Sequence, residues 1–493
     1  MPLSVVRNSI LNLVSAIISM ASGFIAAVVV ARLLGAEGAG VTAFGFWVAS
    51  CAAVICDRGY PQGILRFAAR SDTQSAQRAF IRYSFTRFIP ILVIAFAAAC
   101  ILSFAGKAWT DQADLYVWLA IAVLFLVYGL SNFSLSAARG SGDFYRPARN
   151  TILGSILFVP LSVIGALTIG PAGAILALAS RYMPQALQLS ALIAGNREEH
   201  DGSAIVPDKE FRDYRRQMWI NDVIGIIALS RLEYLFLLIL ATKTDMGYFA
   251  VAIAFAGLVD QLAMQLSSPL VVTFSLDQRR RSNGAWLGVA FLFVPIAMGG
   301  SAIAHLLVPL VYGPEFADTG SAAAVMLLAG GMSALQIVPW TYLAAKGHAM
   351  ALTRVMIISA IVTSIAAPIA ILMDGVYALA WSRLLVESVI LGILIFYARK
   401  KENMRPPVCL LAKMVVSGVA SAIAAFAITL WIPTVTGISL AIICGAVSFL
   451  LTVKLTGAVP RDELSQLFQL MDGRDQNRLA HCLKSSLLCI SRA

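Results

Sequence analysis

Charged residues are scarce in this chain of 493 residues. Asp, Glu, Lys and Arg make up 13% of it and hydrophobic residues 59%, whereas soluble domains carry about a quarter charged residues. The composition therefore excludes a soluble cytosolic protein, a disordered chain and a collagen-like repeat. It predicts an all-α protein that crosses a membrane many times, because each crossing needs about 20 mostly apolar residues.

Patterns that bind metals or carry catalysis are also missing. The seven cysteines are scattered singly through apolar runs and the C-terminal tail, and the sequence contains no CxxC, HExxH or Walker motif. Its four histidines are far apart. We therefore expect no metal site, no cofactor and no catalytic residue, and the chain is not predicted to be an enzyme.

Fourteen apolar runs separated by short loops predict about 14 transmembrane helices. No cleavable signal peptide is expected, because the first run is too long for a signal sequence and leads into Arg32. The runs lie at 10–31, 41–56, 88–105, 115–137, 151–169, 172–193, 220–240, 247–276, 286–311, 322–345, 355–373, 376–396, 410–431 and 438–453.

Basic residues gather in every second loop. One set of loops carries runs such as the three arginines at 279–281, whereas the alternate set holds little beyond Lys107 and Lys243. Because basic residues concentrate in cytoplasmic loops, both termini and all the basic loops are predicted to be cytoplasmic. The net charge of +11 thus reports topology, and we expect no nucleic-acid partner.

Two echoes in the sequence, about 207 residues apart, indicate an internal duplication. The run AARG at 137–140 returns as AAKG at 344–347, and the segment 33–40 resembles 242–248. A repeat of six crossings preserves orientation, so it predicts two six-helix lobes in parallel repeat around a central cavity. The predicted divisions are an N-terminal lobe at 1–195, a cytoplasmic connector at 196–216, a C-terminal lobe at 217–400, an appended helix pair at 401–456 and a cytoplasmic tail at 457–493.

Nine charged residues lie within or at the ends of the predicted spans, where a charge needs a partner or a water-filled cavity. Arginine offers phosphate oxygens a planar fork of donors, so the arginines predict a cavity that binds an anionic head group. The carboxylates are candidates for ion coupling or for counter-ions. The arginines are Arg32, Arg58, Arg181, Arg231 and Arg383, and the carboxylates are Asp57, Glu233, Asp260 and Glu387.

Some of these residues have an equally simple structural interpretation. Arg383 and Glu387 are spaced i,i+4 and can neutralise each other. Asp57 and Arg58 adjoin a Gly-Tyr-Pro sequence and can form a polar pair at the inner interface. Arg32 can extend to the outer surface.

The remaining charges are harder to pair within one helix. Arg231 and Glu233 are two residues apart and point in different directions, which favours a cavity position for Arg231. Arg181 has no acidic neighbour within a helical turn, so its partner must come from another span or from a substrate. Asp260 is either a carboxylate that couples transport to protons or cations, or a counter-ion of Arg231.

Six short motifs give the chain a family resemblance. They are NSI at 8–10, ARLLG at 31–35, DRG at 57–59, LRF at 65–67, VYGPEF at 311–316 and AAKG at 344–347. With them the chain resembles bacterial polysaccharide-biosynthesis flippases, the O-antigen and exopolysaccharide translocases of the multidrug/oligosaccharidyl-lipid/polysaccharide exporter superfamily.

The resemblance implies a two-lobed bundle in the bacterial inner membrane that works by alternating access. Its substrate would be an undecaprenyl-diphosphate-linked oligosaccharide, moved to the periplasmic leaflet, with membrane lipids, a polysaccharide polymerase and glycosyltransferases as partners. The appended helix pair resembles that of the lipid II flippases, where it forms a groove for the lipid tail.

Three other functions stay open. The first is a lipid II flippase, and the second is a multidrug/cation antiporter of the same superfamily, which usually has twelve spans and binds cations through acidic residues. The third is a membrane scaffold for a polysaccharide-assembly complex, which would have no need of buried arginines.

Overall fold

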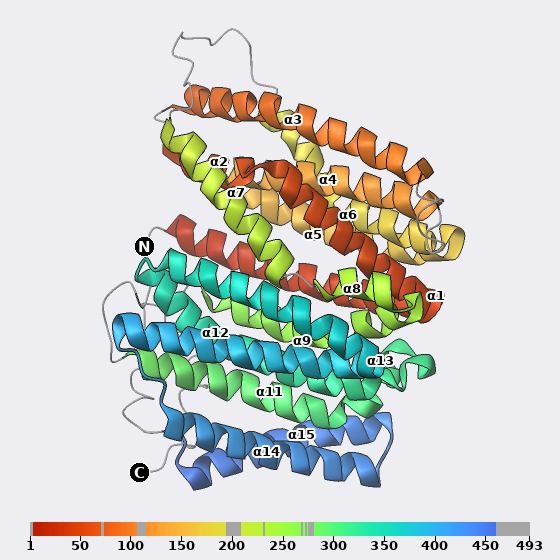
Figure 1. The fold of residues 1–493 in the computed structure, drawn as a ribbon, viewed down its shortest axis with the longest axis vertical. Coiled ribbons are helices and arrows are strands. Elements are labelled where there is room, and N and C mark those ends of the chain that lie inside the picture. The colour runs from red at the N-terminus through yellow and green to blue at the C-terminus, as the bar shows by residue number, and fades with distance from the viewer. Residues whose placement is uncertain are drawn as a thin grey trace. The chain divides into compact units, whose positions relative to one another are not determined.

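Helices make up all the regular structure in the described part of the chain, residues 3–70, 73–105, 115–193, 209–229, 232–267, 270–271, 274 and 281–459 of a computed structural model (Figure 1). Ten of the helices described there are long and apolar enough to cross a membrane. The predicted all-helical, multi-pass fold is therefore confirmed. Contacts divide the chain into two compact units, Met1–Gly247 and Tyr248–Ala493.

In its described residues, the first unit holds eight α-helices, a short 3-10 helix and the start of a further helix. Its first helix, α1, reverses at Gly35, where φ is +69°, a backbone conformation that glycine adopts without steric cost. The predicted spans 10–31 and 41–56 are thus the two arms of α1. The elements are α1 (Leu3–Asp57), α2 (Tyr60–Phe67), η1 (Ala68–Arg70), α3 (Gln74–Ala105), α4 (Leu115–Gly140), α5 (Tyr145–Ile169), α6 (Pro171–Ile193), α7 (Lys209–Leu229), α8 (Glu233–Leu240) and the beginning of α9 (Lys243–Gln265).

The predicted span 220–240 is described in two parts. α7 reaches Leu229, and the short α8 begins at Glu233. Residues 230 and 231, between the two helices, lie outside the described residues.

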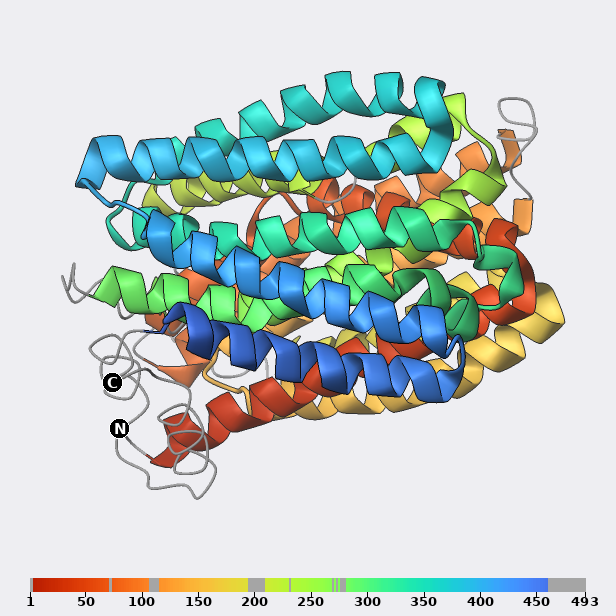
Figure 2. The ribbon, with the colours of Figure 1, turned by 90° about the horizontal axis from the view of Figure 1, so that it is seen from below.

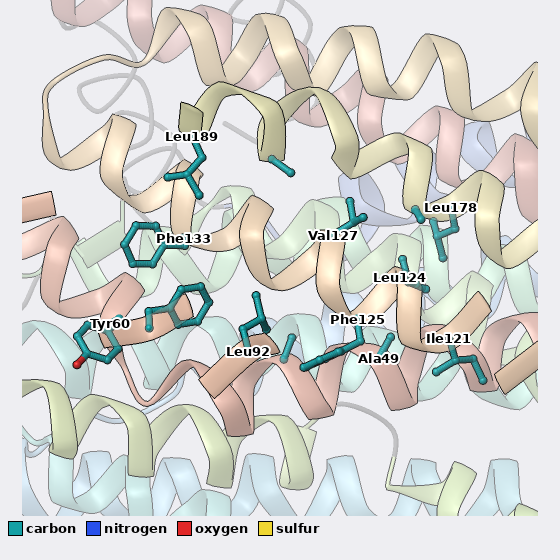
Figure 3. Packing of buried hydrophobic residues seen from close by; sticks show 14 of the residues in the cluster. Ala49, Tyr60, Leu92, Ile121, Leu124, Phe125, Val127, Phe133, Leu178 and Leu189 are labelled. Carbon is teal, nitrogen blue, oxygen red and sulfur yellow. The ribbon is translucent and has the colours of Figure 1, made fainter. Parts of the chain in front are cut away.

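Hydrophobic packing around α4 holds the first unit together. α4 contacts α1, α2, α3 and α6, and the rings of Phe88 and Phe133 stack with their centroids 4.9 Å apart. Figure 3 shows Tyr60 of α2, Phe133 of α4 and Leu189 of α6 converging in this cluster. α6 is thereby fixed against α4, which sets the position of the polar residues that α6 carries.

The second unit contains a second helix that folds back on itself, and it ends in a helix pair. α13 reverses at Asp374 and Gly375, so its two arms correspond to the predicted spans 355–373 and 376–396. α14 and α15 lie side by side (Figure 2), and α14 packs against α11 where Gly418 faces Val294 and Met298. The elements are the rest of α9, then α11 (Arg281–Tyr312), η3 (Pro314–Phe316), α12 (Thr319–Ala345), α13 (Ala349–Glu402), α14 (Val408–Trp431) and α15 (Val435–Thr456).

Helix boundaries confirm the predicted duplication. α3 and α11 are both 32 residues long, and both their first and their last residues differ by about 207 in number. The helix-reversing glycines Gly170 and Gly375 have φ of +66° and +54°. The spacing at that turn is a little shorter than at α3 and α11, so the register of the repeat shifts slightly along the chain.

The second echo, 33–40 with 242–248, brings its two members into contact. A Cβ on Gly40 would lie 2.6 Å from the carbonyl oxygen of Lys243, and a Cβ on Gly247 would lie 1.8 Å from that of Ala36. Lys243 Nζ also lies 3.2 Å from Glu37 Oε1. Each segment therefore offers a glycine to a carbonyl of the other, in a reciprocal contact.

Part of the predicted division of the chain lies outside the described residues. These are residues 194–208 of the predicted connector region and 460–493 of the tail. The divisions at 195, 216, 400 and 456 stay predictions, as does the side of the membrane on which the termini lie.

Candidate functional site

Arg181 lies near the middle of α6 and reaches across to the first arm of α1. Its Nη2 donates to the carbonyl oxygen of Ser19 at 2.6 Å and to the hydroxyl of the same residue. The guanidinium carbon lies 5.4 Å from the centroid of the Phe158 ring on α5. Among the described residues, this half-buried charge is held by a backbone oxygen, a hydroxyl and an aromatic face.

Glycines fix the backbone around Arg181. A Cβ on Gly154 of α5 would lie 1.9 Å from the Arg181 carbonyl oxygen, and a Cβ on Gly23 of α1 would lie 3.1 Å from its Nη1. Glycine at these two positions lets α5 and α1 approach α6 closely. The position of the guanidinium is therefore set by three helices.

Aromatic side chains lie next to Arg181. Tyr182 packs edge to face with Tyr128 at 4.9 Å and parallel to Phe46 at 6.5 Å between ring centroids. Tyr128 hydrogen-bonds the side chain of Asn132 and lies within electrostatic range of both Arg181 and Asp57. The helices α1, α4 and α6 thus place a cluster of aromatic and polar side chains beside Arg181.

Asp57 is the last residue of α1, and its carboxylate accepts a hydrogen bond from the turn that leads into α2. Its Oδ1 accepts a 2.7 Å hydrogen bond from the backbone N–H of Gly59. Arg58 has φ of +50° and is exposed. Asp57 therefore bonds the backbone of the Gly-Tyr-Pro turn through this oxygen.

α7 packs on the same turn. The Arg215 guanidinium lies 4.1 Å from the centroid of the Tyr60 ring, and Trp219 Nε1 donates to the carbonyl oxygen of Ile55 at 3.0 Å. Asp57 lies within electrostatic range of Asp222 and Arg215. Sequence reasoning did not single out Arg215 or Asp222, because both belong to a helix whose partner is distant in the chain.

In the second unit Arg383 and Glu387 form an ion pair. Arg383 Nη2 lies 2.8 Å from Glu387 Oε1, and their side chains are only 14% and 8% exposed. Gln336 of α12 donates to the Glu387 carboxylate at 2.7 Å and to its backbone oxygen at 3.0 Å. Gln336 is an amide within an apolar run, and no other feature of the sequence marks it as a partner of Glu387.

The other predicted residues lie apart from these groups. Arg32 and Arg58 are exposed and sit near opposite ends of the second arm of α1, about 30 Å apart at 1.5 Å per residue. Glu233 is buried at the start of α8, and Asp260 is half-buried on α9. Arg231 lies outside the described residues.

Solved structures with the same fold belong to one superfamily of membrane transporters. The lipid II flippase MurJ in an inward closed conformation matches with a TM-score of 0.72 and 12% identity, over 91% of this chain and 98% of that one. An inward-facing multidrug resistance MATE family transporter of the MOP superfamily matches with a TM-score of 0.63 and 14% identity, over 80% and 98%. A MOP superfamily transporter from Pyrococcus furiosus matches with a TM-score of 0.57 and 16% identity, over 80% and 94%. The chain is thus a multi-pass membrane protein with the fold of the MOP flippases and transporters.

A model of one protein family matches the N-terminal part of the chain. Residues 5–213 match the model described as "Polysaccharide biosynthesis protein", a stretch that includes Arg32, Arg58 and Arg181. A search of curated proteins found no match. The family resemblance seen in the sequence motifs is confirmed by the family model and the fold together.

Proposed function

We propose that the protein is a flippase that moves an undecaprenyl-diphosphate-linked oligosaccharide across the bacterial inner membrane by alternating access. Arg181 is the observation that carries the proposal. A guanidinium at mid-helix depth, held by a backbone oxygen and a serine hydroxyl, keeps its positive charge, and a diphosphate is the group that such a fork of donors binds best. The match of residues 5–213 to polysaccharide biosynthesis proteins supports the same substrate class.

Arg181 would contact the diphosphate while remaining attached to α1. Both of its hydrogen bonds to Ser19 use Nη2, and its side chain is half-buried. The neighbouring Tyr128, Asn132 and Tyr182 offer hydroxyl and amide groups to the substrate. Arg32, Arg58, Arg231 and Arg383 remain candidates for further substrate contacts.

A lipid II flippase is the second candidate. The match to MurJ covers 91% of the chain, whereas the match to the MATE transporter covers 80%. The difference, 11% of 493 residues, is close to the number of residues in α14 and α15, which have 24 and 22 residues. That coverage favours a flippase with an appended helix pair over a twelve-span antiporter or a scaffold.

We place the protein in the inner membrane with both termini in the cytoplasm, working beside a polysaccharide polymerase and glycosyltransferases. Transport is secondary, and Asp260 is the coupling carboxylate. Glu233, Asp57 and Glu387 act as counter-ions.

Deletion of the gene tests the function directly. The flippase proposal expects one lipid-linked glycan to accumulate on the cytoplasmic leaflet, and its sugars identify the substrate. Complementation with Arg181→Gln should restore protein abundance but not export, whereas Ser19→Ala keeps the carbonyl acceptor and should restore both. Normal export by Arg181→Gln would contradict the role of Arg181. A deletion strain without any accumulated lipid-linked glycan would contradict the flippase itself.

A further inference from the structure

Three helices of the first unit are linked by buried amide side chains. Asn150 Nδ2 of α5 donates to Gln188 Oε1 of α6 at 2.6 Å, and Gln185 Nε2 of α6 donates to Ser134 Oγ of α4 at 3.2 Å. All four residues are at most 9% exposed. One hydrogen bond thus links α5 to α6, and another links α6 to α4.

Each of the two glutamines has a second amide atom that takes no part in these bonds, a donor in one and an acceptor in the other. Gln188 Nε2, a donor, and Gln185 Oε1, an acceptor, are both buried and have no hydrogen-bond partner among the residues that the structure describes. Leaving a buried amide atom unbonded is unfavourable, because the group has lost water and gained nothing in return. Gln185 and Gln188 are spaced i,i+3, which places them on one face of α6. The open donor and the open acceptor therefore belong to neighbouring side chains.

We infer that one buried water molecule joins Gln188 Nε2 to Gln185 Oε1. It would accept a hydrogen bond from the first and donate one to the second. The complete chain would then run from Asn150 through Gln188, the water and Gln185 to Ser134, with every donor facing an acceptor. Buried waters commonly bridge polar groups that the protein leaves unsatisfied.

The chemistry of the two open amide atoms favours water over an ion. A cation would face the N–H of Gln188, and an anion would face the carbonyl oxygen of Gln185. Turning either amide by 180° changes which atom is open but still leaves polar atoms without partners. Water is the small ligand that suits each of these arrangements, because it both donates and accepts.

The inferred water lies on the same helix as Arg181. Arg181, Gln185 and Gln188 follow at i, i+4 and i+7, so they share one face of α6. The water would connect α4, α5 and α6 one to two helical turns after Arg181. A buried network in which every polar group is hydrogen-bonded makes such a group of helices rigid. Arg181 would then move together with α4 and α5. The site does not depend on what the protein transports.

A structure of the full chain in lipid nanodiscs, at a resolution that shows ordered waters, tests the inference on the unaltered protein. We expect a density peak at hydrogen-bonding distance, about 2.7–3.2 Å, from both amide heads. Direct contact between the two amides would overturn the inference. So would an empty gap in a map that shows other buried waters.

A double-mutant cycle gives an independent measurement. Gln185→Met and Gln188→Met each remove one direct bond and the water, so each should lower Tm. The double variant loses the water once, and its drop in Tm should be smaller than the sum of the two single drops. Gln185→Met combined with Ser190→Ala is the control, because the exposed Ser190 bonds its own helix and the two effects should add. Full additivity of the two glutamine changes would contradict a shared water.

Discussion

The ion pair of Arg383 and Glu387 illustrates how a single buried charge depends on its neighbours. Glu387 receives hydrogen bonds from Gln336 in addition to its contact with Arg383. Removing one partner of a buried pair leaves the other charge uncompensated, which typically costs about 3–5 kcal/mol. Each member of the pair therefore depends on the other, and neither can be replaced alone without loss of stability.

We predict that Arg383→Gln lowers both the abundance and the Tm of the protein, and that adding Glu387→Gln restores most of the loss. The restoration is expected because two neutral amides remove the uncompensated charge. Thermal unfolding of the purified protein in detergent measures it. Arg354→Gln is the matched control, since Arg354 is exposed on the same helix, and it should change Tm little. A double variant as unstable as Arg383→Gln would show that the pair is not the stabilising contact.

Asp260 supports a prediction about coupling. Asp260→Asn keeps the size of the side chain and removes its titration, so it should abolish the response of transport to an imposed proton or cation gradient. Flux of lipid-linked glycan in proteoliposomes measures the response. The exposed Asp318 provides the control, because Asp318→Asn should respond like the wild type. Equal gradient dependence in all three proteins would remove Asp260 as the coupling residue, and indifference of the wild type to every gradient would remove secondary transport.

At the scale of helices, the close crossing of α1 and the start of α9 limits which residues fit. We predict that Gly247→Ala lowers Tm strongly, because its Cβ would collide with the Ala36 carbonyl oxygen at 1.8 Å and backbone atoms cannot rotate away. Gly392→Ala is the control. Its Cβ would meet open space within helix α13, and alanine favours a helix interior by about 0.8–1.0 kcal/mol. A Gly247→Ala protein as stable as the wild type would show that the crossing is loose.

Sequence predicted the helices better than their breaks. Apolar runs marked both arms of α1 and of α13, since hydropathy follows burial in lipid. The chain reverses between these arms at Gly35 in α1 and at Asp374 and Gly375 in α13. Such turns depend on a few backbone angles, which a hydropathy window averages out.

The candidate site was predictable only where a partner carries a recognisable side chain. The i,i+4 spacing predicted the pairing of Arg383 with Glu387, which the structure shows. The main acceptor of Arg181 is a backbone oxygen of Ser19, 162 residues away, and any residue offers such an oxygen. For the same reason the packing of α7 on the turn after Asp57 left no mark in the sequence.

For the whole molecule, the alternation of basic and bare loops fixes the expected topology. In a variant without its natural cysteines, we predict that single cysteines at Ala204 and Ser282 react only with a membrane-permeant reagent, whereas those at Gln112 and Asp318 react with an impermeant one. The reason is that basic loops remain in the cytoplasm. Labelling of intact and of permeabilised cells measures this. Reversed labelling at either pair would contradict the topology.

The reciprocal contact of Gly40 and Gly247 bears on how the chain arose. In an ancestor of half this length, two identical copies would have met at a two-fold axis, where each residue contacts its counterpart in the partner. One glycine codon would then have satisfied both sides of the crossing. In a single chain the two sides are separate positions, so each glycine is matched to a carbonyl of the other segment and each can be replaced on its own.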